Sequence, residues 1–222
     1  MGIIVAIEGA DGVGKNTTSA GLCAAIQASG RKAEVIGFPR YGETVAGVTI
    51  GRYMAGDMTV KVTPHAAATL YALDRFEWRS AILEAVAAND VLIFDRYVAS
   101  NMAYQGARVA PEESRALMDW ILALETGQFA LPAPTLSIYL DTPWELAKAL
   151  ILQKAERSYT PKTYDEYEAD VSLQQRVRAN YETIVAADLL GPWRIVRASE
   201  NGAMRDRHDI VAEILTHLRA IG

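Results

Sequence analysis

The feature that most constrains the fold is a short apolar run that leads into a glycine-rich loop and then into a helix. Ile3–Ile7 is apolar throughout and has the length of a strand, and glycines recur in residues 9–15. Residues 15–29 show a helical pattern that Gly30 ends. A strand without polar alternation is typical of a parallel sheet buried on both faces. This opening therefore predicts a strand–loop–helix unit of an α/β fold.

The rest of the chain continues the alternation of strands and helices. Further strands are expected at 33–38, 91–94, 136–140 and 193–196. Helices are expected at 44–56, 66–88, 97–108, 112–126, 166–190 and 207–221, with another that begins at Pro143. This order predicts a three-layer fold, with a five-stranded parallel sheet between helices on both faces. We expect a single domain over 1–222, because no linker or internal repeat interrupts the pattern.

Composition limits the classes of partner. A net charge of −5 over 222 residues argues against general nucleic-acid binding, which needs a basic face. No apolar run approaches the length of about 18 residues that a membrane span requires. Cys23 is the single cysteine, so no internal disulfide can form, and we expect a cytoplasmic location.

The glycine loop matches the pattern G-x-x-x-x-G-K. Its residues are Gly9, Ala10, Asp11, Gly12, Val13, Gly14 and Lys15. Glycines let backbone N–H groups turn toward a phosphate chain, the helix N-terminus adds positive potential, and the lysine reaches the terminal phosphates. An ordinary glycine-rich turn is the alternative, but a strand before and a helix after it favour a phosphate-binding P-loop. Asn16 stands where the pattern has Ser or Thr for Mg²⁺, and Thr17 points about 100° further round the helix.

An acid and an arginine follow the third expected strand. Asp95-Arg96-Tyr97 leaves that strand directly, and a carboxylate there, beside a phosphate loop, favours a magnesium-supporting role for Asp95. Arg96 is placed to bridge phosphates. The alternative is a salt-bridged pair at a strand end, which would have no role in catalysis.

The helix that follows carries unusual side chains on one face. Tyr97, Asn101, Tyr104 and Arg108 are spaced i, i+4, i+7 and i+11. A solvated face is the ordinary explanation, but two tyrosines favour the wall of a cleft. Tyr71 and Arg75 lie one turn apart on another expected helix, where core packing with a snorkelling arginine is the alternative.

These segments together resemble the thymidylate kinase family. The matching segments are Glu8–Lys15, Phe38-Pro39-Arg40-Tyr41, Leu73-Asp74-Arg75 and Asp95–Tyr104, in the family's order and spacing. Tyr167-Glu168 and Leu173–Arg176 are similar to the actinobacterial branch. The resemblance covers nearly the whole chain. It implies phosphoryl transfer from ATP to thymidine monophosphate (dTMP), with Mg²⁺, in dTTP biosynthesis.

The resemblance also implies roles for residues. ATP would be held by Gly9, Ala10, Asp11, Gly12, Val13, Gly14, Lys15, Asn16 and Thr17. The acceptor would be held by Asp11, Phe38, Arg40, Tyr41, Tyr71, Arg75, Arg96, Ser100, Asn101, Tyr104 and Arg108. Tyr71 would stack on thymine, Arg75 and Asn101 would recognise the base edge, and Tyr104 would disfavour a 2′-hydroxyl. Asp95 and Asp11 would contact the metal. Catalysis would rest on Lys15, Arg96, Asp11 and a lid cation.

The lid cation is expected in a mobile segment near 148–163. Arg157 is the first candidate and Lys154 the second, and the family also implies a homodimer. The open alternatives are a deoxynucleoside kinase or another nucleotide kinase on the same scaffold, a P-loop regulatory ATPase, and a degenerate kinase that only binds. Arg40 and Arg96 favour a monophosphate acceptor over a nucleoside, and a wall of Tyr71 and Tyr104 has no task in an ATPase.

Overall fold

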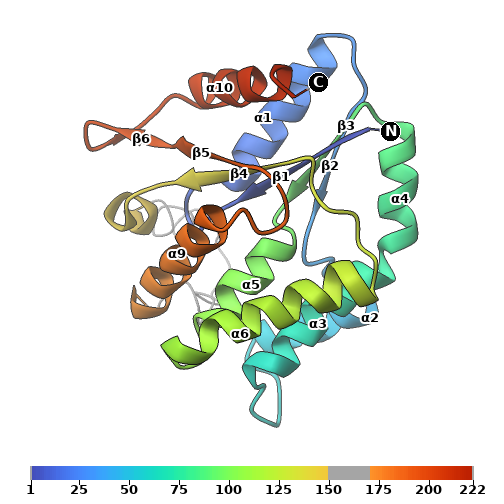
Figure 1. Cartoon of the computed structure of the whole chain (residues 1–222), viewed down its shortest axis with the longest axis vertical. Helices are drawn as coiled ribbons and strands as arrows, with labels where there is room; N and C mark the ends of the chain where they lie inside the picture. The colour runs from blue at the N-terminus through green and yellow to red at the C-terminus, as the bar shows by residue number, and fades with distance from the viewer. Residues whose placement is uncertain (1, 150–170, 222) are drawn as a thin grey trace.

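A parallel sheet forms the centre of the computed structural model, which describes residues 2–149 and 171–221 (Figure 1). Its strands are β1 (Ile3–Glu8), β2 (Ala33–Gly37), β3 (Val91–Asp95), β4 (Leu136–Asp141) and β5 (Trp193–Arg197). They lie in the order β2-β3-β1-β4-β5, and all neighbours are parallel. The predicted α/β class and five-stranded parallel sheet are confirmed. A small antiparallel hairpin of β6 (Ser199–Glu200) and β7 (Ala203–Met204) was not predicted, because two-residue strands leave no periodicity.

The helices occur where the apolar spacing predicts them, with two differences. They are α1 (Lys15–Ala28), α2 (Val45–Met54), α3 (Pro64–Glu77), α4 (Arg79–Ala88), α5 (Val98–Gly106), α6 (Pro111–Leu122), the π-helix η1 (Ala123–Gln128), α9 (Val171–Ala186) and α10 (Arg207–Arg219). Residues 144–149 are also helical. The prediction of one helix over 66–88 is wrong, because Trp78 leaves helical geometry and caps both α3 and α4. The predicted helix over 112–126 is α-helical only as far as Leu122 and then widens into η1.

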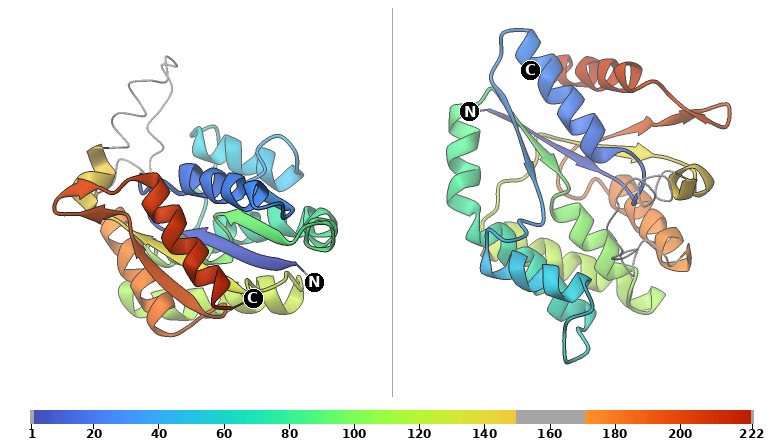
Figure 2. Two further views of the ribbon diagram at one scale, coloured as in Figure 1. Left: turned by 90° about the horizontal axis from the view of Figure 1, so that it is seen from above. Right: turned by 180° about the vertical axis from the view of Figure 1, so that it is seen from behind.

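The sheet separates two apolar cores, one under each layer of helices (Figures 1 and 2). Alternate residues of β1 enter opposite cores, since Val5 and Ile7 pack toward α1 and α10 while Ile4 and Ala6 pack toward α5 and α9. Both faces of the sheet are therefore covered, which explains why β1 is apolar throughout.

The strand order brings three loops to one edge of the sheet. β1 lies between β3 and β4, so the connections diverge at its carboxyl end, which is where ligands bind in open α/β folds. Asp95 pairs in register with Ile7 of β1 and Gly37 of β2, so the three strands end at the same level. No helix in the described ranges is long and apolar enough to cross a membrane.

Candidate active site

The loop after β1 has the backbone of a phosphate cradle. Gly9, Gly12 and Gly14 have φ angles of 148°, 78° and 86°, which side chains rarely tolerate. A Cβ atom on Gly9 would also lie 2.9 Å from the carbonyl oxygen of Leu140. α1 begins at Lys15, and no side chain of the described chain caps its first N–H groups. The N-terminus of α1 is therefore available to an anion.

Lys15 lies inside this loop and is only 6% exposed. Its Nζ donates hydrogen bonds to the carbonyl oxygens of Gly9, at 2.9 Å, and Ala10, at 2.6 Å. Burial, reinforced by the positive charge of Arg96, lowers the pKa of Lys15 to about 7, although Asp11 opposes the shift. The ammonium group is thus held at the place where a phosphate chain would enter.

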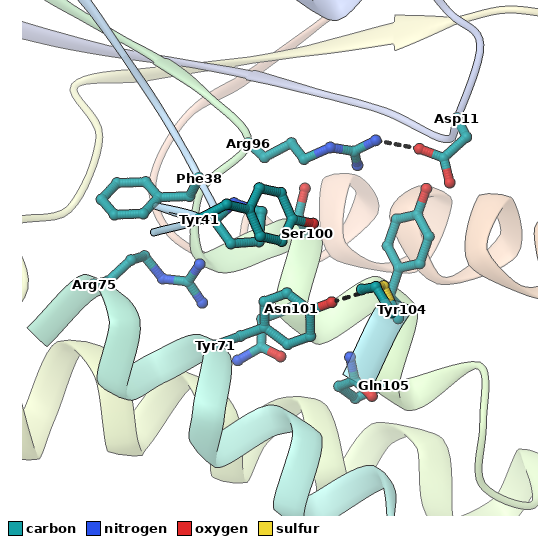
Figure 3. A pocket seen from close by; sticks show the side chains of 12 residues that line it. Asp11, Phe38, Tyr41, Tyr71, Arg75, Arg96, Ser100, Asn101, Tyr104 and Gln105 are labelled. Carbon is teal, nitrogen blue, oxygen red and sulfur yellow. Dashed lines mark hydrogen bonds and ion pairs between the residues drawn. The ribbon is translucent and has the colours of Figure 1, made fainter. Parts of the chain in front are cut away.

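Arg96 and Asp11 form an ion pair (Figure 3), and the charges of both act on Lys15. Arg96 has a φ of 67°, an unfavourable conformation for a residue with a side chain, which costs about 1–2 kcal/mol. This turn off β3 directs the guanidinium toward the glycine loop. Burial alone would raise the pKa of the Asp11 carboxyl, but Arg96 and Lys15 outweigh it and hold that pKa well below its ordinary value.

The helix α9 supplies the second partner of Asp11. The backbone N–H of Asp11 donates to Oε1 of Gln174, at 3.4 Å, and Nε2 of Gln174 donates to Oδ2 of Asp11, at 3.1 Å. Gln174 is buried on the inner face of α9. Gln174 lies in the segment Leu173–Arg176 that resembles the actinobacterial branch, but no role was predicted for it. Its local signal is a polar residue at a core position of an amphipathic helix.

A buried carboxylate, Glu8, joins the end of β1 to two helices. It accepts hydrogen bonds from the backbone N–H of Tyr97 at 2.7 Å, the Ser100 hydroxyl at 2.6 Å and the Tyr181 hydroxyl at 2.9 Å. Burial raises the pKa of Glu8, while these hydrogen bonds partly offset the shift. Glu8 therefore fixes the start of α5 and the middle of α9 against the glycine loop.

A pocket of about 200 Å³ lies between β1, α3 and α5 (Figure 3). It is lined by Asp11, Phe38, Pro39, Tyr41, Met54, Tyr71, Arg75, Arg96, Ser100, Asn101, Tyr104 and Gln105. Nine of these were predicted for the acceptor site, and Pro39, Met54 and Gln105 were not. The Tyr71 hydroxyl lies 3.5 Å from the sulfur of Met54, and the Tyr104 hydroxyl points toward Asp11. The structure thus brings the aromatic and charged candidates to one cavity.

The end of the pocket away from the glycine loop contains a buried ion pair that was not predicted. Arg75 is 2% exposed, and its Nε and Nη2 donate to Glu125 at 2.5 Å and 2.7 Å. Burial would lower the pKa of Arg75, but the Glu125 carboxylate raises it above its ordinary value. Asn101 also donates to Glu125, at 2.8 Å. The alternative in which Arg75 snorkels to solvent is therefore wrong, and nothing in the local sequence marks Glu125.

Two predicted arginines lie away from the pocket lining. Arg40 pairs with Glu43 and places its guanidinium 4.5 Å above the Trp78 ring. Arg108 donates to the Gln105 side chain at 2.6 Å and the carbonyl oxygen of Val62 at 3.0 Å. Neither lines the cavity, although both lie beside residues that do.

Tyr97 differs from the prediction of a cleft wall. It is the N-cap of α5, with an extended φ of −140°, so its side chain does not follow the helical spacing. Its ring is buried and stacks on Phe94 at 4.1 Å between centroids.

Of the residues predicted for the metal and the lid, the structure describes the first group but not the second. Asp95 is half-buried at the end of β3, and its negative charge opposes the lowering of the Lys15 pKa. Asn16 and Thr17 are exposed on the first turn of α1. Within residues 2–149 and 171–221, no group of three or more acidic, histidine or cysteine side chains is arranged for a metal. Arg157 and Lys154 lie outside the described residues.

The fold and the site together define a P-loop phosphotransferase with an acceptor pocket beside the loop. A family model described as thymidylate kinase matches residues 7–204, and the chain belongs to the thymidylate kinase family. It is thus a nucleoside monophosphate kinase.

The relatives agree with this assignment. Thymidylate kinase from Mycobacterium tuberculosis is 36% identical over 88% of this chain and 92% of that protein. A probable thymidylate kinase from Pyrococcus horikoshii is 30% identical over 97% of both chains. The structure of thymidylate kinase from Candida albicans superposes with a TM-score of 0.75 at 21% identity, over 99% of this chain and 92% of that one. The first relative is from an actinobacterium, as the resemblance implied.

Proposed function

We propose that the chain transfers the terminal phosphoryl group of Mg-ATP to dTMP, giving ADP and dTDP. The observation that carries the proposal is a single pocket with two different ends. Arg96 and the glycine loop form a cationic end, whereas Arg75 and Asn101 form a buried hydrogen-bonding end. A nucleoside monophosphate has the same division into phosphate and base.

In this reaction, charged residues bind and align the phosphates, and aromatic residues hold the base and the sugar. The loop amides and Lys15 bind the phosphates of ATP, and Arg96 aligns the acceptor phosphate and neutralises charge on the transferred group. Tyr71 stacks on the base, and Tyr104 crowds the 2′ position of the sugar. Arg40 supplies a second cation if it exchanges Glu43 for the acceptor phosphate. No covalent nucleophile is needed, because a phosphate oxygen attacks directly.

The residues at the end of β3 fit Mg²⁺. The ion is usually held by one or two carboxylates together with waters and substrate phosphates, so a single well-placed acid is enough. Asp95 is that acid, since Asp11 is already paired with Arg96. When bound, the ion neutralises charge between the ATP phosphates.

The proposal extends to the domain organisation, the oligomeric state and the cellular location. The chain acts as a single domain with a closing segment near 148–163 that carries Arg157 or Lys154 as a further cation. The exposed Val48 of α2 and Trp120 of α6 are consistent with a homodimer formed through helices, which light scattering of the purified protein tests. A cytoplasmic location follows from the substrates.

The direct test is ADP release from Mg-ATP with dTMP, dUMP, dCMP, dGMP, AMP, thymidine or no acceptor. Activity that requires dTMP, with dUMP weaker, is the expected result. Activity on thymidine would instead assign a nucleoside kinase, and ADP release without an acceptor would assign an ATPase. Binding of dTMP without turnover would assign a degenerate kinase.

A further inference from the structure

One buried carboxylate holds both polar residues at the base end of the pocket. Glu125 is completely buried, and its two oxygens accept from Arg75 of α3 and Asn101 of α5. These three residues come from separate helical segments. A carboxylate accepts hydrogen bonds at both oxygens, so Glu125 can hold the Arg75 guanidinium at two points and still accept from Asn101 at Oε1.

The π-helical geometry of η1 is what brings Glu125 to this place. The backbone N–H of Phe129 bonds to the carbonyl oxygen of Leu124, five residues earlier, at 2.9 Å. The extra residue in this turn changes the direction of the side chains relative to α6, and such turns occur frequently at functional sites. Glu125 is the buried side chain of η1.

The contacts of Asn101 fix which of its amide atoms faces the pocket. Nδ2 donates to the carbonyl oxygen of Ala68 at 3.0 Å and to Glu125 at 2.8 Å. Two acceptors on one side identify that atom as nitrogen and leave Oδ1 on the other. Oδ1 is buried and has no hydrogen-bond partner among residues 2–149 and 171–221. A buried acceptor without a partner is costly, which indicates that a donor on the ligand completes it.

Arg75 presents hydrogen-bond donors beside this acceptor. The ion pair with Glu125 uses Nε and Nη2, while the guanidinium has five N–H donors in total. Arg75 lines the pocket, and its guanidinium extends toward the space next to Asn101 (Figure 3). The base end therefore offers an acceptor and a donor side by side.

We propose that Glu125 is the positioning residue that makes this pocket select thymine or uracil over cytosine. The inference rests on the proposed dTMP kinase function. Thymine presents an N3–H donor beside an O4 acceptor, which complements Asn101 Oδ1 and Arg75. Cytosine presents an N3 acceptor beside an N4 amino donor, so both contacts become repulsive or unpaired. Glu125 fixes which donor and acceptor atoms of Arg75 and Asn101 face the base, although it does not itself contact the base.

The test is Glu125→Gln, which keeps the shape but replaces one acceptor by an N–H₂ donor. Arg75 donates to both oxygens and so loses a hydrogen bond whichever way the new amide turns, and Asn101 loses its own if the amide nitrogen replaces Oε1. We expect kcat/KM for dTMP to fall about 30-fold, mainly through KM, and the dTMP-to-dCMP preference to fall about tenfold or more. The KM for ATP should stay within about twofold of wild type, as the glycine loop is untouched. Glu113→Gln, an exposed residue of α6, is the matched control and should leave every value unchanged.

Glu125→Asp covers the case in which the Gln variant does not fold. It keeps the charge but shortens the reach, so the dTMP preference should fall by a smaller factor. An unchanged dTMP-to-dCMP ratio in the folded variant, with wild type active on dTMP, would overturn the role of Glu125 alone. Wild-type enzyme without activity on dTMP would overturn the proposed function as well, so the two failures are distinguishable.

Discussion

The glycine loop and the acceptor pocket are neighbours, but they are built in different ways. The loop is formed by consecutive residues, 9–15, and its binding groups are mainly backbone N–H groups. The pocket is formed by side chains from the loops after β1, β2 and β3 and from α2, α3 and α5, and it is held by Gln174 and Glu125 from outside. A main-chain site depends on a few glycines and one lysine. A side-chain site depends on partners that never touch the ligand.

The two ends of the pocket differ in charge as well. At the phosphate end, Arg96 pairs with Asp11, while Lys15 donates to backbone carbonyl oxygens beside the uncapped N-terminus of α1, so the end is available to an anion. At the base end, the charge of Arg75 is balanced by the charge of Glu125. This pair therefore orients hydrogen bonds toward the ligand but adds no net charge. We therefore expect substitutions at the phosphate end to reduce turnover and substitutions at the base end to alter selectivity.

The largest effect is expected for Arg96→Met. The change removes the cation that faces the acceptor phosphate and leaves Asp11 buried without its ion pair, so kcat should fall about 10³-fold. Steady-state ADP release measures it, with Arg115→Met on the exposed face of α6 as the control. A decrease of less than about tenfold would show that the phosphate end does not carry the transfer.

Gln174→Met should have a smaller effect at the same end. The variant keeps the volume but removes both hydrogen bonds to Asp11, so kcat/KM should fall about tenfold. The neighbouring Gln175 is exposed, and Gln175→Met is therefore a matched control. Equal activities of the two variants would contradict a role for α9 in holding Asp11.

Tyr104→Ala tests the middle of the pocket, between the two ends. If the ring crowds the 2′ position, its removal should raise activity on UMP relative to dUMP by about tenfold. Tyr104→Phe keeps the ring and should leave the ratio unchanged. The same increase in both variants would assign the discrimination to the hydroxyl group, which points toward Asp11.

The smallest expected effect is the uptake of a proton by Lys15 when ATP binds. Free Lys15, with a pKa of about 7, is mostly neutral at pH 8, and the negative charge of a bound triphosphate raises that pKa. ATP binding at pH 8 should therefore take up close to one proton, and binding at pH 6 almost none. Calorimetry in two buffers of different ionisation enthalpy measures the uptake. Lys15→Arg, which is always protonated, should abolish it, and uptake that persists in this variant would exclude Lys15 as the source.

The contrast between the two regions also explains what could be predicted from the sequence. The loop lies between an apolar strand and a helix, so its spacing and its neighbours identify it without tertiary information. The five strands of the main sheet were predicted for the same reason, since each is a short local run rich in apolar residues. Nine lining residues were predicted: eight lie in the segments that resemble the family, and Tyr71 lies two residues before one of them.

The supporting residues could not be predicted in this way. Glu125 lies in an expected helix, and only the π-turn and the approach of Arg75 show that it faces inward. Tyr97 was misplaced because helical spacing was counted from a residue that caps the helix. Arg40 was expected at the acceptor phosphate, but Glu43 and Trp78 hold it beside the pocket. Each depends on contacts between segments distant in sequence or on local backbone geometry.

The central claim is that one pocket holds base and phosphate at opposite ends, next to a separate nucleotide loop. A crystal structure with dTMP and Mg-ADP tests it most directly. We expect N3 of thymine to donate to Asn101, O4 to accept from Arg75, and the dTMP phosphate to lie at Arg96. Lys15 should leave the carbonyl oxygens of Gly9 and Ala10 for the nucleotide phosphates. A base bound outside this pocket, or Lys15 still bonded to its own loop beneath bound ADP, would contradict the account.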